Sequence, residues 1–276
     1  MPQVEIRLLK DHEEFRECER IQLAVWGTLG VAGEVLSVTQ KYGGVVLGAL
    51  VRGNVVGFIY AFLARRHGRL VHWSHMMAVL AKFRDLGLGF RMKLAHRDLA
   101  LQQGLKSICW TYDPLQSRNA ALNIRRLGAS VEDYVPDCYG HFQSAIEKGL
   151  ASDRLVVNWR IASPAVARRL REGAPPTRDV RLPRANETQL NAHGFVENRS
   201  IFLNLSSPRI LVEIPAHTDA MRARALSLAR RWRAETRKIF HRYFSASYRV
   251  VDFVPPGPAS DGRCFYVLRR HGQASA

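Results

Sequence analysis

The stretch AVLAKFRDLGLG, residues 78–89, decides the fold. It predicts the end of an apolar strand, then a basic loop, then a helix that begins at Gly87 and Gly89. Glycine lets a ligand approach the backbone closely, and the first amides of a helix have no partner within that helix. Because the helix dipole also attracts anions, this stretch predicts a cradle for a phosphate or pyrophosphate group.

The residues on either side of this loop predict a mixed domain of strands and helices. Asp11 is a candidate N-cap, Gly53-Asn54 predicts the tight turn of an antiparallel hairpin, and Phe90, Leu94 and Leu99 give the helical periodicity after the loop. Strands are expected over residues 4–9, 44–51, 55–64, 71–80, 106–112, 129–135 and 153–161, and helices over residues 11–25, 33–42, 87–103 and 118–127. The expected fold class is α+β, with a mostly antiparallel sheet and one β-α-β crossover between residues 71–80 and 106–112.

The rest of the chain predicts a different organisation. Five prolines interrupt residues 162–208, which favours a linker that wraps the surface. After it, a strand is expected over residues 209–214, a long arginine-rich helix over 216–244, and a hairpin over 249–254 and 264–269, which repeats the helix-strand-strand ending of the first part. We therefore expect a domain at 1–161, a linker at 162–208 and a second lobe with its own core at 209–276.

Composition excludes several classes of protein. The 276 residues are 47% hydrophobic and 24% charged, which supports a packed core and excludes disorder as the main state. No apolar run approaches the ~18 residues of a membrane span, and the N-terminus lacks the features of a secretory signal. The four cysteines lie far apart, so neither a disulfide framework nor a zinc site is indicated and a reduced cytoplasm is the default. The net charge of +17 indicates attraction to anionic partners, either nucleic acid or small phosphorylated or carboxylated molecules.

Three groups of residues carry a resemblance to a known family. Arg84-x-x-Gly87-x-Gly89, between a central strand and a long helix, resembles the acyl-coenzyme A signature of the GNAT superfamily of N-acyltransferases. Residues 119–129, NAALNIRRLGA, resemble the family's helix and turn after the fifth strand. The likeness covers residues 4–161. The further motifs SHM at 74–76, WTYDPL at 110–115, RNA at 118–120 and EIP at 213–215 look like a two-part branch of predicted GNAT acyltransferases, in a neighbourhood where some members resemble N-succinyltransferases.

The resemblance implies an acyl-CoA, either acetyl-CoA or another, as co-substrate and no metal. It implies that the backbone of Met77 and Val79 pairs with the pantetheine arm and that the Met77 amide polarises the thioester carbonyl. The cofactor-binding residues that it implies are Met77, Val79, Arg84, Asp85, Leu86, Gly87, Leu88, Gly89 and Asn119. In this set the amides of residues 85–89 hold the pyrophosphate and Arg84 supplies positive charge.

Acyl transfer to an amine requires a base for the ammonium and benefits from an acid for the departing thiolate. His75 is the candidate base, because an imidazole titrates near neutral pH and a histidine on the corresponding strand of the related arylalkylamine N-acetyltransferases relays protons. The alternative is a buried histidine bonded to backbone. The family's usual acid, a tyrosine, falls on Ile124, which cannot donate a proton. Either the thiolate leaves unassisted or another tyrosine serves; the candidates are Tyr112, Tyr134 and Tyr139, of which Tyr139 is preferred.

Two residues after the strand at 106–112 are candidates for substrate binding. Asp113 either binds the substrate ammonium or is a turn residue before Pro114, and Arg118 is a candidate for an acyl carboxylate or a phosphate. Arg230, Arg233 and Arg237 share one side of the long C-terminal helix, as a solvated face or as a carboxylate-binding face near the acceptor pocket.

The sequence thus predicts an acyl-CoA-dependent N-acyltransferase that moves an acetyl or succinyl group directly to the amine of a small metabolite such as an amino acid. The alternatives are a basic nucleic-acid-binding or RNA-modifying protein and a CoA-binding protein without catalysis. The expected partner is a small amine; a membrane is not expected, nucleic acid is disfavoured, and a homodimer is left open.

Overall fold

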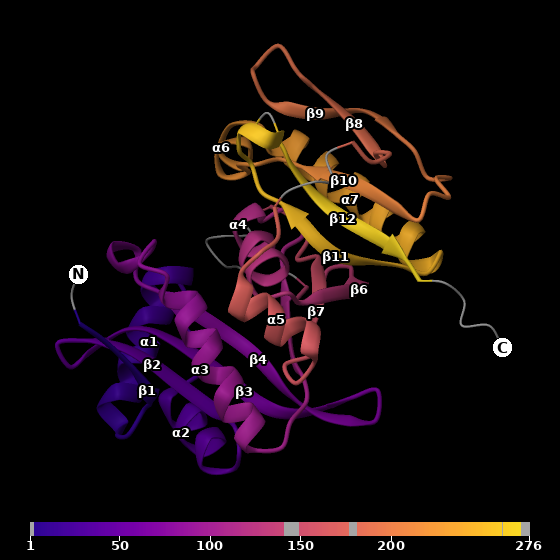
Figure 1. The fold of residues 1–276 in the computed structure, drawn as a ribbon. Helices are drawn as coiled ribbons and strands as arrows, with labels where there is room; N and C mark the ends of the chain where they lie inside the picture. Colours follow the sequence, from indigo (N-terminus) through magenta and orange to yellow (C-terminus); the bar gives the residue numbers. More distant parts are fainter. Residues whose placement is uncertain (1–2, 141–148, 177–180, 261, 272–276) are drawn as a thin grey trace. The chain divides into compact units, whose positions relative to one another are not determined.

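The computed structural model describes residues 3–140, 149–176, 181–260 and 262–271. Contacts divide the chain into two compact units: residues 1–110, 143–148 and 160–163 form the first, and residues 111–142, 149–159 and 164–276 form the second (Figure 1). The sequence predicted that the first domain ends at residue 161. The structure instead groups the C-terminal region with residues 111–142, because these segments share a sheet and a core.

The first unit is built on a sheet with strand order β1-β2-β3-β4-β5. These strands are β1 (Val4–Leu8), β2 (Val45–Val51), β3 (Asn54–Arg66), β4 (Arg69–Val79) and β5 (Ile108–Tyr112). Neighbours are antiparallel from β1 to β4, whereas β4 and β5 are parallel and are connected through η1 (Ala81–Phe83) and α3 (Leu88–Gln102). The expected fold class, a mostly antiparallel sheet with one β-α-β crossover, is confirmed.

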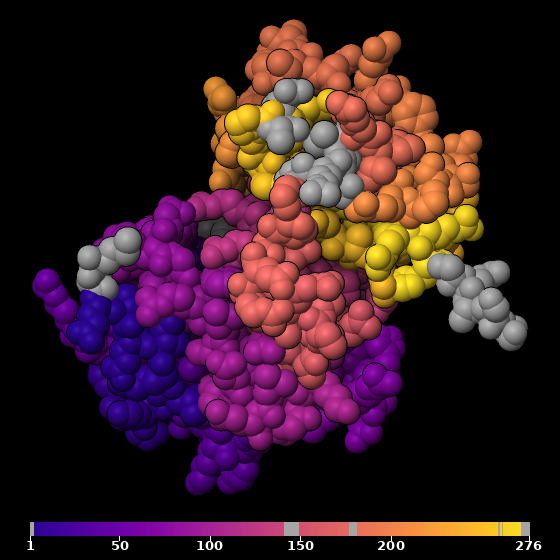
Figure 2. Space-filling view, viewed as in Figure 1, coloured from indigo at the N-terminus to yellow at the C-terminus, as the bar shows by residue number. Residues whose placement is uncertain are grey.

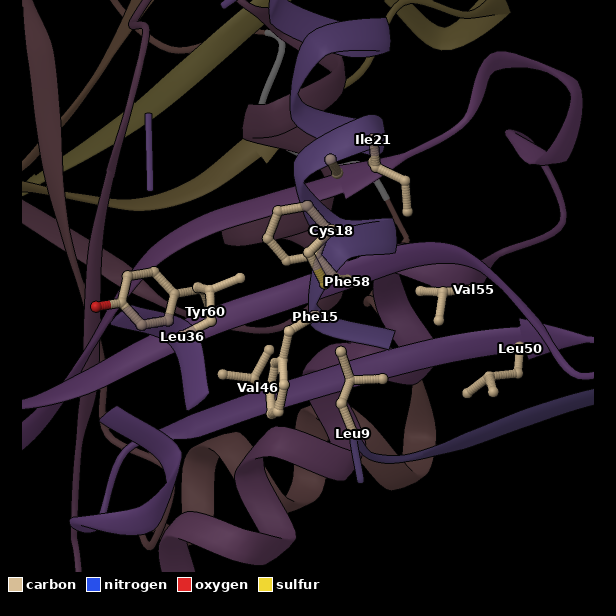
Figure 3. Packing of buried hydrophobic residues seen from close by; sticks show 11 residues of the cluster. Leu9, Phe15, Cys18, Ile21, Leu36, Val46, Leu50, Val55, Phe58 and Tyr60 are labelled. Atoms are coloured by element: carbon tan, nitrogen blue, oxygen red, sulfur yellow. The ribbon is translucent and has the colours of Figure 1, made fainter. Parts of the chain in front are cut away.

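Helices cover both faces of this sheet. On one face, α1 (His12–Trp26) and α2 (Gly33–Lys41) contribute Phe15, Cys18, Ile21 and Leu36 to a buried cluster that includes Phe58 of β3 (Figure 3). On the other face, α3 packs Leu88 and Met92 against β2 and β3. The Asp11 side chain accepts a hydrogen bond from the Glu14 amide, so the expected N-cap of α1 is confirmed.

The hairpin between β2 and β3 turns one residue earlier than expected. Val51 pairs with Asn54, so the two-residue loop is Arg52-Gly53 rather than Gly53-Asn54. Both loop residues have positive φ, at 52° and 82°, which is the geometry of a type I′ turn. Gly53 accepts this conformation without cost, and Asn54 begins the strand.

The second unit contains a sheet with strand order β7-β6-β11-β12-β10 and a separate hairpin of β8 and β9. Its elements in chain order are α4 (Ser117–Ala120), the π-helical turn η2 (Ala121–Arg126), β6 (Ser130–Val135), β7 (Arg154–Trp159), α5 (Pro164–Glu172), β8 (Asn186–Leu190), β9 (Val196–Ile201), β10 (Arg209–Ile214), α6 (Asp219–Arg224), α7 (Leu226–Ser245), β11 (Tyr248–Val254), η3 (Pro258–Ser260) and β12 (Cys264–Arg270).

Residues 162–208 are not the irregular linker that their prolines suggested. They contain α5, β8 and β9, while residues 177–180 lie outside the described residues. Pro164 is the first residue of α5, where its missing N–H costs nothing. This helix lies at the surface of the second unit (Figure 2). Its one buried residue among those described is Val166.

The long helix expected over residues 216–244 is two helices. Ala225, with φ −146° and ψ 57°, separates α6 from α7. The α7 helix buries one side, which carries Leu228, Trp232, Thr236, Ile239, Phe240 and Tyr243. Their spacing of three to four residues is the helical period. The sequence predicted one continuous helix here and missed the break at Ala225.

A single contact between strands explains why the C-terminal region is not a separate lobe. Val131 of β6 pairs with Val250 of β11, so the β6–β7 and β11–β12 hairpins form one sheet. Each hairpin follows a helix, which agrees with the helix-strand-strand order that the sequence shows twice. The sheet of residues 209–276 thus continues into residues 130–159, while Leu211, Val254, Phe265 and Val267 form a buried cluster within the C-terminal region.

Candidate active site

The loop after β4 has the open geometry that the glycine pattern predicts. Asp85 and Gly87 both have left-handed backbone conformations, with φ of 64° and 70°. Gly87 is the N-cap of α3, and its carbonyl accepts the first helical bond from the Arg91 amide at 3.1 Å. A Cβ atom added to Gly87 would meet nothing within 4 Å. The first turn of α3 therefore opens into free space, where its amides can receive an anion.

The side chains around this loop differ in burial. Leu88 is buried and packs between α3 and the sheet, so it holds the start of the helix in place. Arg84, Asp85 and Leu86 are exposed, and the Arg84 Nε atom donates to the Val79 carbonyl at 3.3 Å. The Arg84 guanidinium thus lies next to the end of β4 and adds positive charge at the helix start.

His75 is the extra residue of a β-bulge in β4. Ser74 pairs with Ala61 and Met76 pairs with Tyr60, so His75 has no partner on β3. A bulge interrupts the ladder and redirects side chains, which is a common device next to active sites. Beyond the bulge, Met77 and Val79 resume pairing with β3, at Ile59 and Gly57.

Met77 and Val79 lie beyond the part of β4 that is paired with β5. The parallel register contains His72 opposite Ile108 and Trp73 opposite Cys109. The last residues of β4 therefore extend past this register, in the position where the family likeness expects a pantetheine arm to pair.

The His75 imidazole lies near two aromatic rings of β3. Its ring lies 6.1 Å from the Tyr60 ring and 6.0 Å from the Phe62 ring, measured between centroids. Desolvation lowers the pKa of His75, so the neutral form predominates at pH 7. The side chain is exposed, and no hydrogen bond to it comes from any residue that the structure describes. In the described part of the chain the His75 ring bonds to no backbone atom, and its role stays a prediction.

The candidate tyrosines belong to the second unit and have different environments. Tyr112 and Tyr134 are buried, and burial raises the pKa of each, which makes both hydroxyls poorer proton donors. Tyr139 is exposed, and its hydroxyl lies 3.0 Å from the Thr111 hydroxyl. Ile124 is fully buried at the family's tyrosine position. Tyr139 thus stays the candidate acid.

Asp113 does not have the free carboxylate that ammonium binding needs. Its oxygens accept two hydrogen bonds from Arg233, at 2.6 and 2.7 Å, and Oδ1 also accepts the Leu115 amide at 2.8 Å. The last contact is the turn role that the sequence left open. Because Arg233 neutralises the charge, we do not retain Asp113 as a substrate-binding residue.

Arg118 and Asn119 lie side by side on α4, and both are exposed. The sequence-predicted site residues thus fall into two groups. His75, Met77, Val79 and residues 84–89 belong to the first unit, and Asp113, Arg118, Asn119 and Tyr139 belong to the second.

The chain is similar over 56–58% of its length to three solved acetyltransferases. A GNAT-family acetyltransferase from Streptococcus pneumoniae is 16% identical, with 56% of this chain and 98% of that chain covered and a TM-score of 0.46. The ribosomal-protein-S18-alanine N-acetyltransferase of Escherichia coli is 12% identical, covering 58% and 96%, with a TM-score of 0.48. Arabidopsis thaliana Naa50 in complex with a bisubstrate analogue is 14% identical, covering 56% and 97%, with a TM-score of 0.46. No family model matches the sequence, and no curated protein matches it.

The structure also contains a buried polar cluster that the sequence did not predict. Lys93 of α3 is 2% exposed, and its Nζ atom lies 3.1 Å from the Ser74 hydroxyl and 3.7 Å from the Trp110 ring centroid. Burial lowers the pKa of Lys93 to about 7. His96, one turn later, contacts His72 at 3.1 Å between ring nitrogens.

Phe90, Leu94 and Leu99, whose spacing predicted this helix, are not its most buried residues. The buried residues are Leu88, Met92, Lys93, His96 and Ala100, and Leu99 is partly buried against the cluster of Leu88 and Met92. The buried set has helical spacing but includes two titratable residues, so hydrophobicity alone did not identify it.

A second unpredicted cluster joins three elements of the second unit. Asp153 is fully buried and accepts two hydrogen bonds from Arg237, at 2.8 and 2.6 Å, and one from the Tyr134 hydroxyl at 2.6 Å. Burial opposes ionisation of Asp153, but these donors outweigh it, so its pKa is lowered. Arg237 is thereby neutralised.

Among the described residues, no group of three or more His, Cys, Asp or Glu side chains is arranged to hold a metal ion, and no described helix could span a membrane.

Proposed function

We propose that this protein is an acyl-CoA-dependent N-acyltransferase that transfers an acetyl or succinyl group to the amine of a small metabolite such as an amino acid. The observation that carries the proposal is the pairing of an open helix start after β4 with a bulge in the same strand at His75. The helix start can bind a pyrophosphate, and the bulge places an imidazole with a lowered pKa twelve residues before Gly87.

In this proposal the helix start and Arg84 bind the pyrophosphate of the acyl-CoA. The residues present fit that group, because Gly87 leaves the space in front of the amides open and Arg84 adds charge. The acyl-CoA supplies an activated thioester. The Met77 amide is the candidate donor to the thioester carbonyl oxygen, a contact that strengthens as negative charge develops there.

His75 takes one proton from the substrate ammonium, directly or through water. The free amine then attacks the thioester carbonyl, the new C–N bond forms, and the C–S bond breaks with release of the CoA thiolate. Tyr139 is the candidate that returns a proton to that sulfur; its hydroxyl already has a partner in Thr111. His75 ends the reaction protonated and loses its proton to solvent. The nitrogen loses a second proton as the amide forms, and a proton from solvent restores the Tyr139 hydroxyl after it has protonated the thiolate.

The test is the affinity for CoA of a Gly87→Glu variant, measured by titration calorimetry. A side chain and a negative charge in front of the amides should weaken CoA binding at least tenfold, which corresponds to about 1.4 kcal/mol. Gly68→Glu is the matched control, because Gly68 has a φ of 73° and equally open surroundings but lies in the β3–β4 turn. Unchanged CoA affinity in a folded Gly87→Glu protein contradicts the proposal.

One observation favours a second function, a CoA-binding protein without catalysis. Ile124 is fully buried where the family has its tyrosine acid, and the replacement Tyr139 comes from a different element. Incubation with acetyl-CoA and succinyl-CoA against a panel of amines separates the two functions. CoA binding without release of free thiol would leave only the second function.

A further inference from the structure

A cavity of about 220 Å³ lies beside α7 in the second unit. It is bounded by residues 149–151 and by Arg230, Arg233, Ala234 and Arg237. The helical residues are spaced three or four apart, which places them on one face of α7. The small side chain of Ala234 leaves room between the three arginines.

The three arginines of this cavity are not equally neutralised. Arg233 is paired with Asp113, and Arg237 is paired with Asp153, each through two hydrogen bonds. Arg230 instead donates from Nε to the Gly149 carbonyl at 2.9 Å. Within residues 3–140, 149–176, 181–260 and 262–271, no carboxylate lies at ion-pair distance from Arg230. Counting the described residues alone, the cavity therefore carries about one uncompensated positive charge.

The same arginines retain unused hydrogen-bond donors. A guanidinium has five N–H groups. Arg230 uses its Nε–H on Gly149, which leaves the four Nη hydrogens available. Arg233 is 3% exposed, and both of its Nη groups already donate to Asp113, so Arg230 supplies the donors for a ligand.

We propose that this cavity binds the carboxylate group of a small metabolite. One excess positive charge matches a monoanion better than a dianionic phosphate. Forked guanidinium donors match the two oxygens of a carboxylate. The volume lies below that of pockets for drug-sized ligands, so it suits one short acid group rather than a whole cofactor.

Binding is measured on the full chain by titration calorimetry with sodium acetate, sodium succinate and sodium phosphate, at constant ionic strength and without CoA. The absence of CoA makes the result independent of the proposed acyl transfer. Acetate and succinate should each bind at a single saturable site. Arg230→Gln should weaken that binding at least tenfold, because it removes the excess charge and the Nη donors. Ala234→Glu should abolish it, because the new carboxylate occupies the cavity.

Arg231→Gln is the matched control. Arg231 neighbours Arg230 on α7 but pairs with Glu197, and it does not line the cavity. It should leave carboxylate affinity unchanged. Three results each overturn the proposal: no saturable carboxylate binding by the unmodified chain, tighter binding of phosphate than of either carboxylate, or equal losses in the folded Arg230→Gln and Arg231→Gln variants.

Discussion

Arg233 and Asp113, 120 residues apart in the chain, form a buried two-fold ion pair that joins α7 to the end of β5. Burial opposes ionisation of Asp113, but the charge and hydrogen bonds of Arg233 outweigh it, so the pKa of Asp113 is lowered. The pair connects Asp113, in the first 161 residues, to Arg233 in the C-terminal region. Both residues belong to the second unit.

Asp113→Leu should destabilise the protein by about 3–5 kcal/mol, because it leaves the Arg233 charge buried and unpaired. The double variant Asp113→Leu, Arg233→Met should recover much of this loss, since neither charge is then buried. Urea unfolding curves of the two variants provide the measurement. A double variant as unstable as Asp113→Leu would show that the pair does not hold these elements together.

A chain that ends at residue 161 should fail to fold stably. The truncation removes Arg233 from Asp113, Arg237 from Asp153, and the whole of β11 from the edge of β6. Two buried carboxylates would then lose their cationic partners. Circular dichroism and analytical gel filtration of the fragment test this. A soluble, cooperatively unfolding fragment would restore the independent domain that the sequence suggested.

Lys93→Met should raise thermal stability at neutral pH and flatten its dependence on pH. The pKa of Lys93 is about 7 in the folded chain against 10.5 for an ordinary lysine. Between those values the unfolded chain binds the extra proton, so the contribution of Lys93 to folding stability rises with pH and is smallest below pH 7. The expected gain at neutral pH is a few kcal/mol.

The measurement is the melting temperature at pH 7 and pH 9.5, for Lys93→Met and for the exposed-site control Lys106→Met. The melting temperature of Lys93→Met should change less between the two pH values than that of the unmodified chain. Parallel pH curves for Lys93→Met and the unmodified chain would mean that Lys93 is not a desolvated charge.

His75→Ala should lower kcat/KM about a hundredfold at pH 7, within the usual range for loss of a general base. The loss should shrink at high pH, where more of the amine is already deprotonated. Because the pKa of His75 is lowered, the acidic limb of the unmodified enzyme should fall below the usual histidine value of 6.5.

The control for this pH profile is His12→Ala, which removes an exposed imidazole at the start of α1. It should leave the profile unchanged. A His75→Ala profile with the same shape and height as that of the unmodified enzyme would leave His75 with a packing role only.

Local signals in the sequence determined the elements of the first unit. Asp11 caps a helix because its side chain reaches the Glu14 amide three residues away, and Gly87 opens α3 because its φ of 70° favours glycine. Such effects act within one turn, so they can be found without knowledge of the fold. The cradle at residues 84–89 could be predicted for the same reason.

Pairing between distant segments decided the rest. The bulge at His75 depends on the register against β3, and the role of Asp113 depends on Arg233 in α7. The β6–β11 contact between Val131 and Val250 merges two segments that composition separated. No local pattern predicts these contacts, because each needs two segments that are distant in the sequence. Strand edges form their hydrogen bonds, and buried charges form their ion pairs, only after the chain has folded. The sequence by itself therefore determined the glycine-opened loop after β4 and the element order through β7, and only the tertiary structure decided which charges are neutralised among the described residues.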